Sequence, residues 1–258
     1  MKDLIKFHDG ETIELEFNEE KHWYFVDGEY IPSVTTVLNS IAKPALLPWA
    51  VKEGADWFKA NCLNYDSFHD NDKAIDEVVK GIKGAYRKKS EGAMNIGDIL
   101  HKWCKGAILW KLGKGPIPEM PDNPKVKESI DNFREWVSSN EVEWLSAEEK
   151  LYNRKYGFAG TVDAVAEVNG EFAVIDFKTS KRIYNEYQLQ VAAYAETVED
   201  IYGRDVDCCW LLRFDKFDGS FEDVRISGDE HADNFNAFHG AKMLYSRLNT
   251  LKNRAKSR

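Results

Sequence analysis

Apolar and polar positions along this chain predict two β-hairpins. Asn169-Gly170 lies between two alternating apolar runs, and this dipeptide favours the two-residue turn that joins antiparallel strands. Asp27-Gly28 lies in a similar setting within residues 21–31. Ser33 follows that hairpin as the predicted N-cap of a helix. The chain is therefore predicted to mix strands and helices.

The remaining segments predict an α/β fold. The predicted helices cover residues 34–41, 48–60, 73–89, 97–110 and 124–139, the segment around Gln190 and the C-terminal segment; the predicted strands cover residues 142–152, 158–168, 172–178 and 208–214, with a short hairpin through Asp218-Gly219. Four prolines mark residues 113–124 as a loop. It separates a hairpin and helical region, residues 1–112, from a sheet-containing region, residues 124–258. We expect both to pack as one compact unit, with a mixed sheet between helices.

The register of the Asn-Gly hairpin predicts two opposed carboxylates. Val168 faces Glu171 across the turn, so Asp163 falls opposite Asp176, with Cα atoms on the order of 4.5–5.5 Å apart. Like charges at this distance repel unless one is protonated or a cation lies between them. The spacing therefore predicts a site for a hard divalent metal ion. Lys178 shares this face, because side chains alternate along a strand.

An Asp-x-Lys sequence on a strand is, by itself, typical of a solvated edge. Here it follows an apolar run, residues 173–175, that predicts a buried central strand, where an unpaired aspartate is costly. The next predicted helix carries Gln190 and Tyr194 four residues apart on one face. That face is able to direct an amide and a phenol hydroxyl toward the strand ends.

These motifs resemble those of the PD-(D/E)XK nuclease superfamily, and in particular its RecB-type branch, which includes stand-alone exonucleases such as the mitochondrial genome maintenance exonuclease and phage relatives. The matching segments are Gly160-Thr-Val-Asp163, Asp176-Phe-Lys178, Gln190-Val-Ala-Ala-Tyr194 and, upstream, Gly97-Asp-Ile-Leu-His101. Together they cover roughly residues 95–195. The resemblance implies a restriction-endonuclease-like central mixed sheet flanked by helices, with an N-terminal helical arch or lid.

The resemblance also implies residue roles. The implied metal ligands are His101, Asp163, Asp176 and the backbone carbonyl of Phe177, for Mg²⁺ and also for Mn²⁺. Lys178 is implied to support the attacking water, and Gln190 and Tyr194 to contact DNA. A further catalytic acid is expected on the preceding strand, where Glu148 and Glu149 are the candidates and Glu148 is preferred.

Net charge limits how the chain meets nucleic acid. A net charge of −9 argues against a general nucleic-acid coat, although a nuclease needs positive potential only along the path of the backbone. Lys83, Arg87 and Lys88 lie in a stretch without acids that leads to the Gly97…His101 motif, so we predict that they contact phosphates. A second basic stretch, residues 242–258, is more typical of a solvated helix face.

Cysteines and apolar runs bear on cofactors and location. Cys62, Cys104, Cys208 and Cys209 are neither evenly paired nor a CxxC motif, and they lack the clustered pattern of relatives that hold an iron–sulfur cluster. We therefore expect neither a zinc site nor such a cluster. No run approaches the ~18 apolar residues of a membrane helix, and the N-terminus lacks a signal-peptide core. The expected location is the cytoplasm of a bacterial or phage-infected cell, without a membrane partner.

The predicted function is a metal-dependent DNA exonuclease in recombination, repair or replication, with DNA that has a single-stranded end as partner. A structure-specific DNA endonuclease is one alternative, and a non-catalytic DNA-binding or assembly protein with a nuclease fold is another. The acidic pair and Lys178 argue against the second, because a binding module has no need of them. A glycosidase ranks lowest, since its carboxylates straddle a sugar at ~5–9.5 Å without a strand lysine.

Overall fold

The computed structural model describes residues 1–41, 46–61, 72–215 and 218–256. The chain forms two compact units, Met1–Ile41 with Ile99–Arg258, and Ala42–Asp98. This division differs from the expected regions 1–112 and 124–258. The reason is that residues 1–41 pack on the main sheet: the Ala159 amide donates to the Pro32 carbonyl at 3.0 Å.

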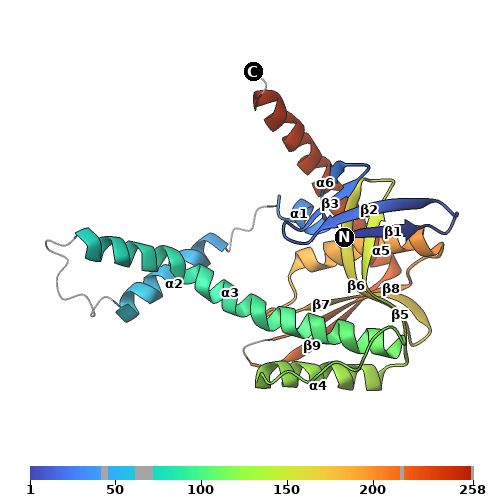
Figure 1. Cartoon of the computed structure of the whole chain (residues 1–258), viewed down its shortest axis with the longest axis horizontal. Coiled ribbons are helices and arrows are strands. Elements are labelled where there is room, and N and C mark those ends of the chain that lie inside the picture. The colour runs from blue at the N-terminus through green and yellow to red at the C-terminus, as the bar shows by residue number, and fades with distance from the viewer. Residues whose placement is uncertain (42–45, 62–71, 216–217, 257–258) are drawn as a thin grey trace. The chain divides into compact units, whose positions relative to one another are not determined.

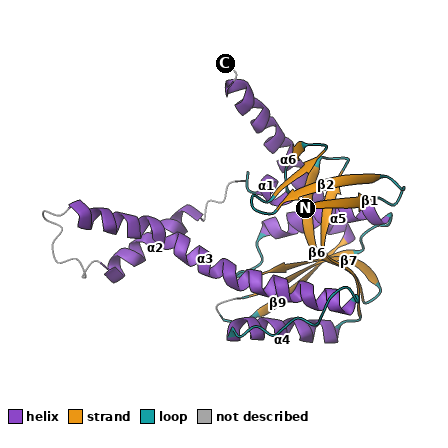
Figure 2. Ribbon diagram, viewed as in Figure 1, coloured by secondary structure: helices purple, strands orange, loops and turns teal. Residues whose placement is uncertain are grey.

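The larger unit is built on a five-stranded mixed sheet. Its strands, in spatial order, are β5 (Val142–Asn153), β6 (Phe158–Val168), β7 (Glu171–Lys178), β8 (Cys208–Phe214) and β9 (Phe221–Ser227). Among the described strands of this sheet, only β7 and β8 pair in parallel, and α5 (Asn185–Tyr202) connects them. Helices flank the sheet (Figure 2). The predicted α/β class with a central mixed sheet is therefore confirmed.

A four-stranded antiparallel sheet precedes it. Its strands are β1 (Lys2–Lys6), β2 (Thr12–Asn18), β3 (Trp23–Val26) and β4 (Glu29–Ile31). The predicted hairpin at Asp27-Gly28 is confirmed, because Val26 pairs with Glu29 and both turn residues have positive φ. The first two strands were not predicted, although Thr-Ile-Glu-Leu-Glu-Phe-Asn in β2 alternates at the strand period.

The remaining helices follow the predicted pattern with one exception. They are α1 (Val34–Leu38), α2 (Leu46–Asn61), α3 (Asp72–Lys111), α4 (Pro124–Ser139) and α6 (Gly228–Lys256) (Figure 1). Ser33 caps α1 as predicted, accepting from the Thr36 amide at 3.0 Å. The two helices predicted at 73–89 and 97–110 are one helix, α3, because residues 90–96 contain no proline and a single glycine does not end a helix. Within the described ranges, no helix is both long and apolar enough to span a membrane.

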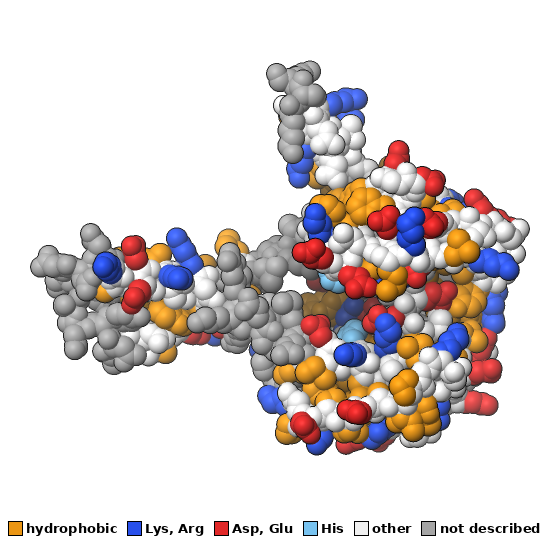
Figure 3. Space-filling view, viewed as in Figure 1, with side chains coloured by type: hydrophobic (Ala, Val, Ile, Leu, Met, Phe, Trp, Pro, Cys, Tyr) orange, Lys and Arg blue, Asp and Glu red, His pale blue; other side chains and the backbone are white. Residues whose placement is uncertain are grey.

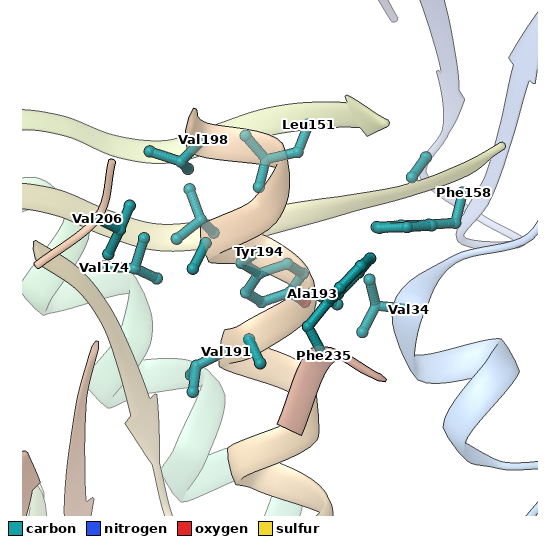
Figure 4. Close-up of a cluster of buried hydrophobic side chains, with 14 of the residues drawn as sticks. Val34, Leu151, Phe158, Val174, Val191, Ala193, Tyr194, Val198, Val206 and Phe235 are labelled. Carbon is teal, nitrogen blue, oxygen red and sulfur yellow. The ribbon is translucent and has the colours of Figure 1, made fainter. Parts of the chain in front are cut away.

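One face of the main sheet holds the larger apolar core. Val191, Tyr194 and Val198 project from α5 into this core, where they lie among residues such as Val174 of β7 and Leu151 of β5 (Figure 4). Residues of α1, α6 and the N-terminal sheet belong to the same cluster. Burial of this apolar surface fixes α5 against β6 and β7.

The other face carries an aromatic cluster beneath α3 and α4. The Phe133 ring of α4 lies 6.3 Å from Trp103 of α3, 6.1 Å from Trp144 of β5 and 5.6 Å from Phe177 of β7, between ring centroids. The Phe177 ring is also 5.9 Å from the imidazole of His101. These contacts hold the last turns of α3 against β7.

The described cysteines are structural. Cys104, Cys208 and Cys209 are free and buried. Burial raises the pKa of the Cys208 thiol to about 11 and raises the pKa of the other two well above the usual value. Thiols in this state are poor nucleophiles and poor metal ligands. Cys62 lies outside the described residues.

The Asn169-Gly170 turn allows a test of the hairpin. Gly170 has φ 82° with open space around an added Cβ, so Gly170→Ala should cost about 1–2 kcal/mol through backbone strain alone. Gly240 in α6 also has open space around an added Cβ, but its φ is not positive, so Gly240→Ala should stabilise by about 0.5–1 kcal/mol. Urea unfolding of the two variants measures both effects, and equal effects would contradict the assigned turn.

Candidate functional site

Side chains from four elements meet near the C-terminal end of β7. They are His101 of α3, Asp163 of β6, Asp176 and Lys178 of β7, and Gln190 and Tyr194 of α5. In the space-filling view, a histidine lies in a hollow of the larger unit beside acidic and basic side chains (Figure 3). The structure thus brings together the residues that the sequence motifs singled out.

The predicted hairpin register is observed up to the residue before the acidic pair. The β6–β7 pairs run from Val168–Glu171 to Ala164–Ile175, which is the predicted register. Asp163 and Asp176 would be the next pair, but the ladder ends before them. Instead, Oδ2 of Asp163 accepts a hydrogen bond from the Phe177 amide at 2.7 Å. The direct opposition of Asp163 and Asp176 therefore stays a prediction, and a side-chain carboxylate takes the place of the next main-chain hydrogen bond.

A chain of polar contacts joins β7 to α5. The Lys178 ammonium lies 2.6 Å from Oδ2 of Asp176 and donates to Oε1 of Gln190 at 3.0 Å. Nε2 of Gln190 donates to the Tyr194 hydroxyl at 2.9 Å and lies 3.4 Å from Oδ1 of Asp176. The Gln190 amide is thereby oriented by three neighbours, and it in turn fixes the position of the ammonium.

Gly160 makes the approach of α5 possible, a role that its motif position alone did not reveal. A Cβ at Gly160 would lie 2.6 Å from Cε1 of Tyr194, which is too close for any side chain. The absent side chain lets the Tyr194 ring lie against β6. The glycine of the Gly160-Thr-Val-Asp163 motif therefore leaves the space in which Tyr194 lies, and Tyr194 accepts a hydrogen bond from Gln190.

His101 and Asp163 form the second half of the cluster. Nδ1 of His101 lies 3.4 Å from Oδ1 of Asp163. Burial opposes charge on the imidazole, but the neighbouring Asp163 carboxylate outweighs it and raises the pKa of His101. Burial also opposes charge on Asp163. The neighbouring His101 and Lys178 and the hydrogen bond from the Phe177 amide outweigh this effect of burial and lower the pKa of Asp163. Asp163 is thus held as a carboxylate.

Asp176 is the residue of the cluster whose negative charge is least favoured by its surroundings. It is 2% exposed, and burial, together with the charge of Asp163, outweighs Lys178 and raises the pKa of Asp176 to about 6. Burial opposes charge on Lys178 as well, but the two carboxylates raise its pKa. A carboxyl group that titrates near neutral pH beside a charged lysine is typical of a functional site.

The donor types in the cluster fit a divalent cation. Two carboxylates and an imidazole suit Mg²⁺ or Mn²⁺, and Oδ2 of Asp176 is a buried carboxylate oxygen. In the described ranges, however, no three His, Cys, Asp or Glu side chains already converge as ligands. The Lys178 ammonium, at 2.6 Å, lies against that oxygen instead. The side chains are therefore of the types that bind a divalent cation, but their present arrangement is that of the ion pair between Asp176 and Lys178.

The structure distinguishes Glu148 from Glu149. The flanking β5–β6 pairs, Ala147–Ala164 and Glu149–Val162, place residue 148 opposite Asp163. Glu148 has φ 48° and lies 3.2 Å from the ammonium of Lys105, whereas Glu149 accepts from the Tyr202 hydroxyl at 2.8 Å on the α5 side. Glu148 therefore lies on the Asp163 side of β5.

The upstream basic residues lie in the smaller compact unit. Lys83 is exposed on α3, while the side chains of Arg87 and Lys88 lie outside the described residues. Gly97 is buried in the same helix. Phosphate contact by Lys83, Arg87 and Lys88 stays a prediction, which the salt dependence of DNA binding by the triple Ala variant would test.

A cavity lined by both acidic and basic side chains was not anticipated. Its volume is about 600 Å³, and its walls include Lys105, Lys150, Glu148 and Phe17. The Lys150 ammonium donates to Thr161 Oγ1 at 2.9 Å, and burial lowers the pKa of Lys150. Lys105 follows His101 by four residues, so the helical period was a signal that both share one face.

Arg213 lies near the cluster and was not singled out by the sequence motifs. It pairs with Lys178 in the β7–β8 register and is 6% exposed. Its guanidinium donates to the Ser180 carbonyl at 3.2 Å and to Glu222 at 2.8 Å. It therefore anchors the segment that directly follows Lys178. The continuous apolar run of β8 predicts a buried strand, but it does not predict the partners of Arg213.

Comparisons with known proteins give a distant relationship. No protein-family model matches the chain. The chain is 24% identical over 156 residues to an ATP-dependent helicase/nuclease subunit of Clostridium perfringens (strain SM101 / Type A), covering 55% of this chain and 11% of that protein. The chain thus spans about a tenth of that relative's length. A crystal structure of LHK-Exo in complex with dAMP matches with 16% identity and a TM-score of 0.32, covering 64% of this chain and 92% of that chain.

Titration of Asp176 tests the electrostatics of the cluster. In ¹³C-aspartate-labelled protein with chelator present, the Asp176 carboxyl, assigned with an Asp176→Asn variant, should titrate at about 6 instead of 3.8. Lys178→Met should move this midpoint higher, because the ammonium lowers the pKa of its neighbour. Lys155→Met, whose side chain is 69% exposed, is the control and should leave it unchanged. A wild-type midpoint near 4 would contradict the assigned burial.

Proposed function

We propose that this protein is a divalent-metal-dependent deoxyribonuclease of the PD-(D/E)XK superfamily, RecB-type branch, and that it acts as an exonuclease. The observation that carries the proposal is the buried cluster of two carboxylates, an imidazole and a lysine at the end of β7. Phosphodiester hydrolysis requires a group that neutralises the developing charge and one that orients the attacking water. The cluster offers both. Similarity to a helicase/nuclease protein supports the same class.

In this proposal the carboxylates and the imidazole hold the ion. The ligands would be Asp163, Asp176 and His101, with the Phe177 carbonyl completing the set and Glu148 as a further catalytic acid. When bound, the ion would polarise a phosphate oxygen and lower the pKa of a water from 15.7 towards ~7. Mg²⁺ suits the carboxylates, and Mn²⁺ suits the imidazole as well.

Lys178 is the proposed positioner of the water and the stabiliser of the phosphate. Its ammonium is held between Asp176 and Gln190, so it has a defined position before substrate arrives. Preorganised charge of this kind is more effective than charge that must move during the reaction. Tyr194 is 4% exposed, so its proposed role is to hold Gln190, and direct DNA contact falls to Gln190.

Exonuclease action is the finer part of the proposal and rests on the family resemblance. Recombination, repair or replication, in a phage or bacterial setting, is the proposed context. A structure-specific endonuclease would use the same cluster. End-labelled linear DNA and circular DNA, single-stranded and duplex, separate the two, because an exonuclease leaves circles intact.

Metal dependence is the first test of this function. Cleavage of linear DNA should stop in excess EDTA and return with Mg²⁺ or Mn²⁺. Mn²⁺ should also stabilise the folded protein, by about 2.7 kcal/mol at a hundredfold excess over its Kd, measured by thermal unfolding. Asp163→Asn with Asp176→Asn is the control and should lose that stabilisation. Undiminished cleavage in EDTA would rule out the proposal.

Substitution of Lys178 separates catalysis from binding. Lys178→Ala should keep DNA affinity, because the side chain is mostly buried, but lose about 10³-fold in cleavage rate, corresponding to roughly 3–4 kcal/mol of lost transition-state stabilisation. Lys155→Ala is the matched control for removal of a lysine and should cleave normally. Single-turnover rates at saturating DNA decide the matter, and wild-type turnover by Lys178→Ala would show that this lysine is not catalytic.

A further inference from the structure

The second half of α6 exposes an apolar surface that the proposed nuclease does not use. Its first half is anchored in the core by Phe235 and Phe238, which are buried. Further along, Leu244, Leu248 and Leu251 are 54%, 42% and 44% exposed. Figure 1 shows this end of α6 running beyond the packed elements of the larger unit. None of these residues belongs to the polar cluster at the end of β7.

The spacing of the three leucines is that of a helix-pairing seam. They lie at positions i, i+4 and i+7, and at 3.6 residues per turn they fall within about 60° of the helix circumference. A helix that lies on a lipid surface has a wider apolar face, whereas a narrow stripe at this spacing is the seam that packs against one other helix. We call Leu244, Leu248 and Leu251 the leucine seam.

Both sides of the leucine seam are basic. Arg247 and Arg254 lie along one side and Lys252 along the other, and all three are exposed. No Asp or Glu occurs between residues 234 and 258. Residues that flank a helix seam face the flanking residues of the partner helix, so their charges select the partner.

This charge pattern disfavours a second copy of the chain. In a parallel pair of α6 helices, Arg247 of one copy would face Lys252 of the other. In an antiparallel pair, arginine would face arginine and lysine would face lysine. Each arrangement places like charges together, which destabilises the pair. A helix with acidic residues beside its own apolar seam would instead be complementary to Arg247, Lys252 and Arg254.

We propose that the leucine seam of α6 binds an acidic amphipathic helix of a partner protein. The seam would bury its leucines against the partner's apolar stripe, while Arg247 and Lys252 pair with flanking carboxylates. Such a contact would tether the protein to a partner without involving the cluster on β7. The proposal stands independently of the nuclease function.

The experiment uses the full chain and a synthetic three-heptad peptide with leucine at the seam positions and glutamate at the flanks. Fluorescence anisotropy should show saturable binding of this peptide. The same peptide with lysine at the flanks should not bind. Absence of binding by the glutamate peptide, or equal binding of both peptides, overturns the proposal.

Variants locate the contact. Leu244→Ser, Leu248→Ser and Leu251→Ser together should weaken binding of the glutamate peptide at least about tenfold, while helicity and DNA cleavage stay unchanged. Met243→Ser is the matched control, because Met243 is 62% exposed but lies off the seam, and it should bind normally. Arg247→Glu with Lys252→Glu should exchange the preference, losing the glutamate peptide and gaining the lysine peptide.

Two further measurements test whether the leucine seam instead binds a second copy of the chain or a lipid surface. Sedimentation velocity should give the same mass for the wild type and the triple serine variant, and co-sedimentation with vesicles of phosphatidylcholine and phosphatidylglycerol should be negligible. Self-association that the serine variant abolishes would assign the seam to a second copy instead. Vesicle binding that depends on the same leucines would assign it to a lipid surface. Either result overturns the proposal.

Discussion

The candidate site depends on the buried ion pair between Asp176 and Lys178, and the packing of the larger unit holds this pair in place. Removing both charges from water costs several kcal/mol per ion, and the pair tolerates this only because each partner has further polar neighbours. Gln190 supplies one neighbour to each. Burial, together with the negative charge of Asp163, raises the pKa of Asp176 to about 6. A buried carboxyl group whose pKa is raised in this way is typical of sites that carry out chemistry.

Packing on both faces of the main sheet holds the residues of this cluster in position. On one face the apolar core fixes α5, and the missing side chain of Gly160 lets Tyr194 approach closely enough to orient Gln190. On the other face the aromatic cluster around Phe133 holds the last turns of α3, so that His101 reaches Asp163. The catalytic candidates thus come from elements whose positions are fixed by packing, as preorganised sites require.

Much of the fold could be predicted because its local signals agree. The Asn169-Gly170 turn fixed the hairpin register, Pro124 and Asn123 mark the start of α4, and β7 and β8 each contain a continuous apolar run. Two features that the sequence did not reveal have physical causes. Residues 90–96 contain no helix-stopping residue, so α3 continues. The pairing ladder stops before Asp163 because its carboxylate binds the Phe177 amide, a side-chain contact that backbone periodicity does not encode.

The sequence by itself determined which residue types carry the chemistry: period-2 alternation put Asp176 and Lys178 on one side of a strand, and the helical period put Gln190 and Tyr194 on one side of a helix. Only the tertiary structure decided how these sides meet. It paired Lys178 with Asp176, placed Glu148 rather than Glu149 on the Asp163 side, and joined residues 1–41 to the main sheet. The reason is that periodicity describes one element at a time, whereas distances between elements follow from packing, which depends on contacts between residues far apart in the chain.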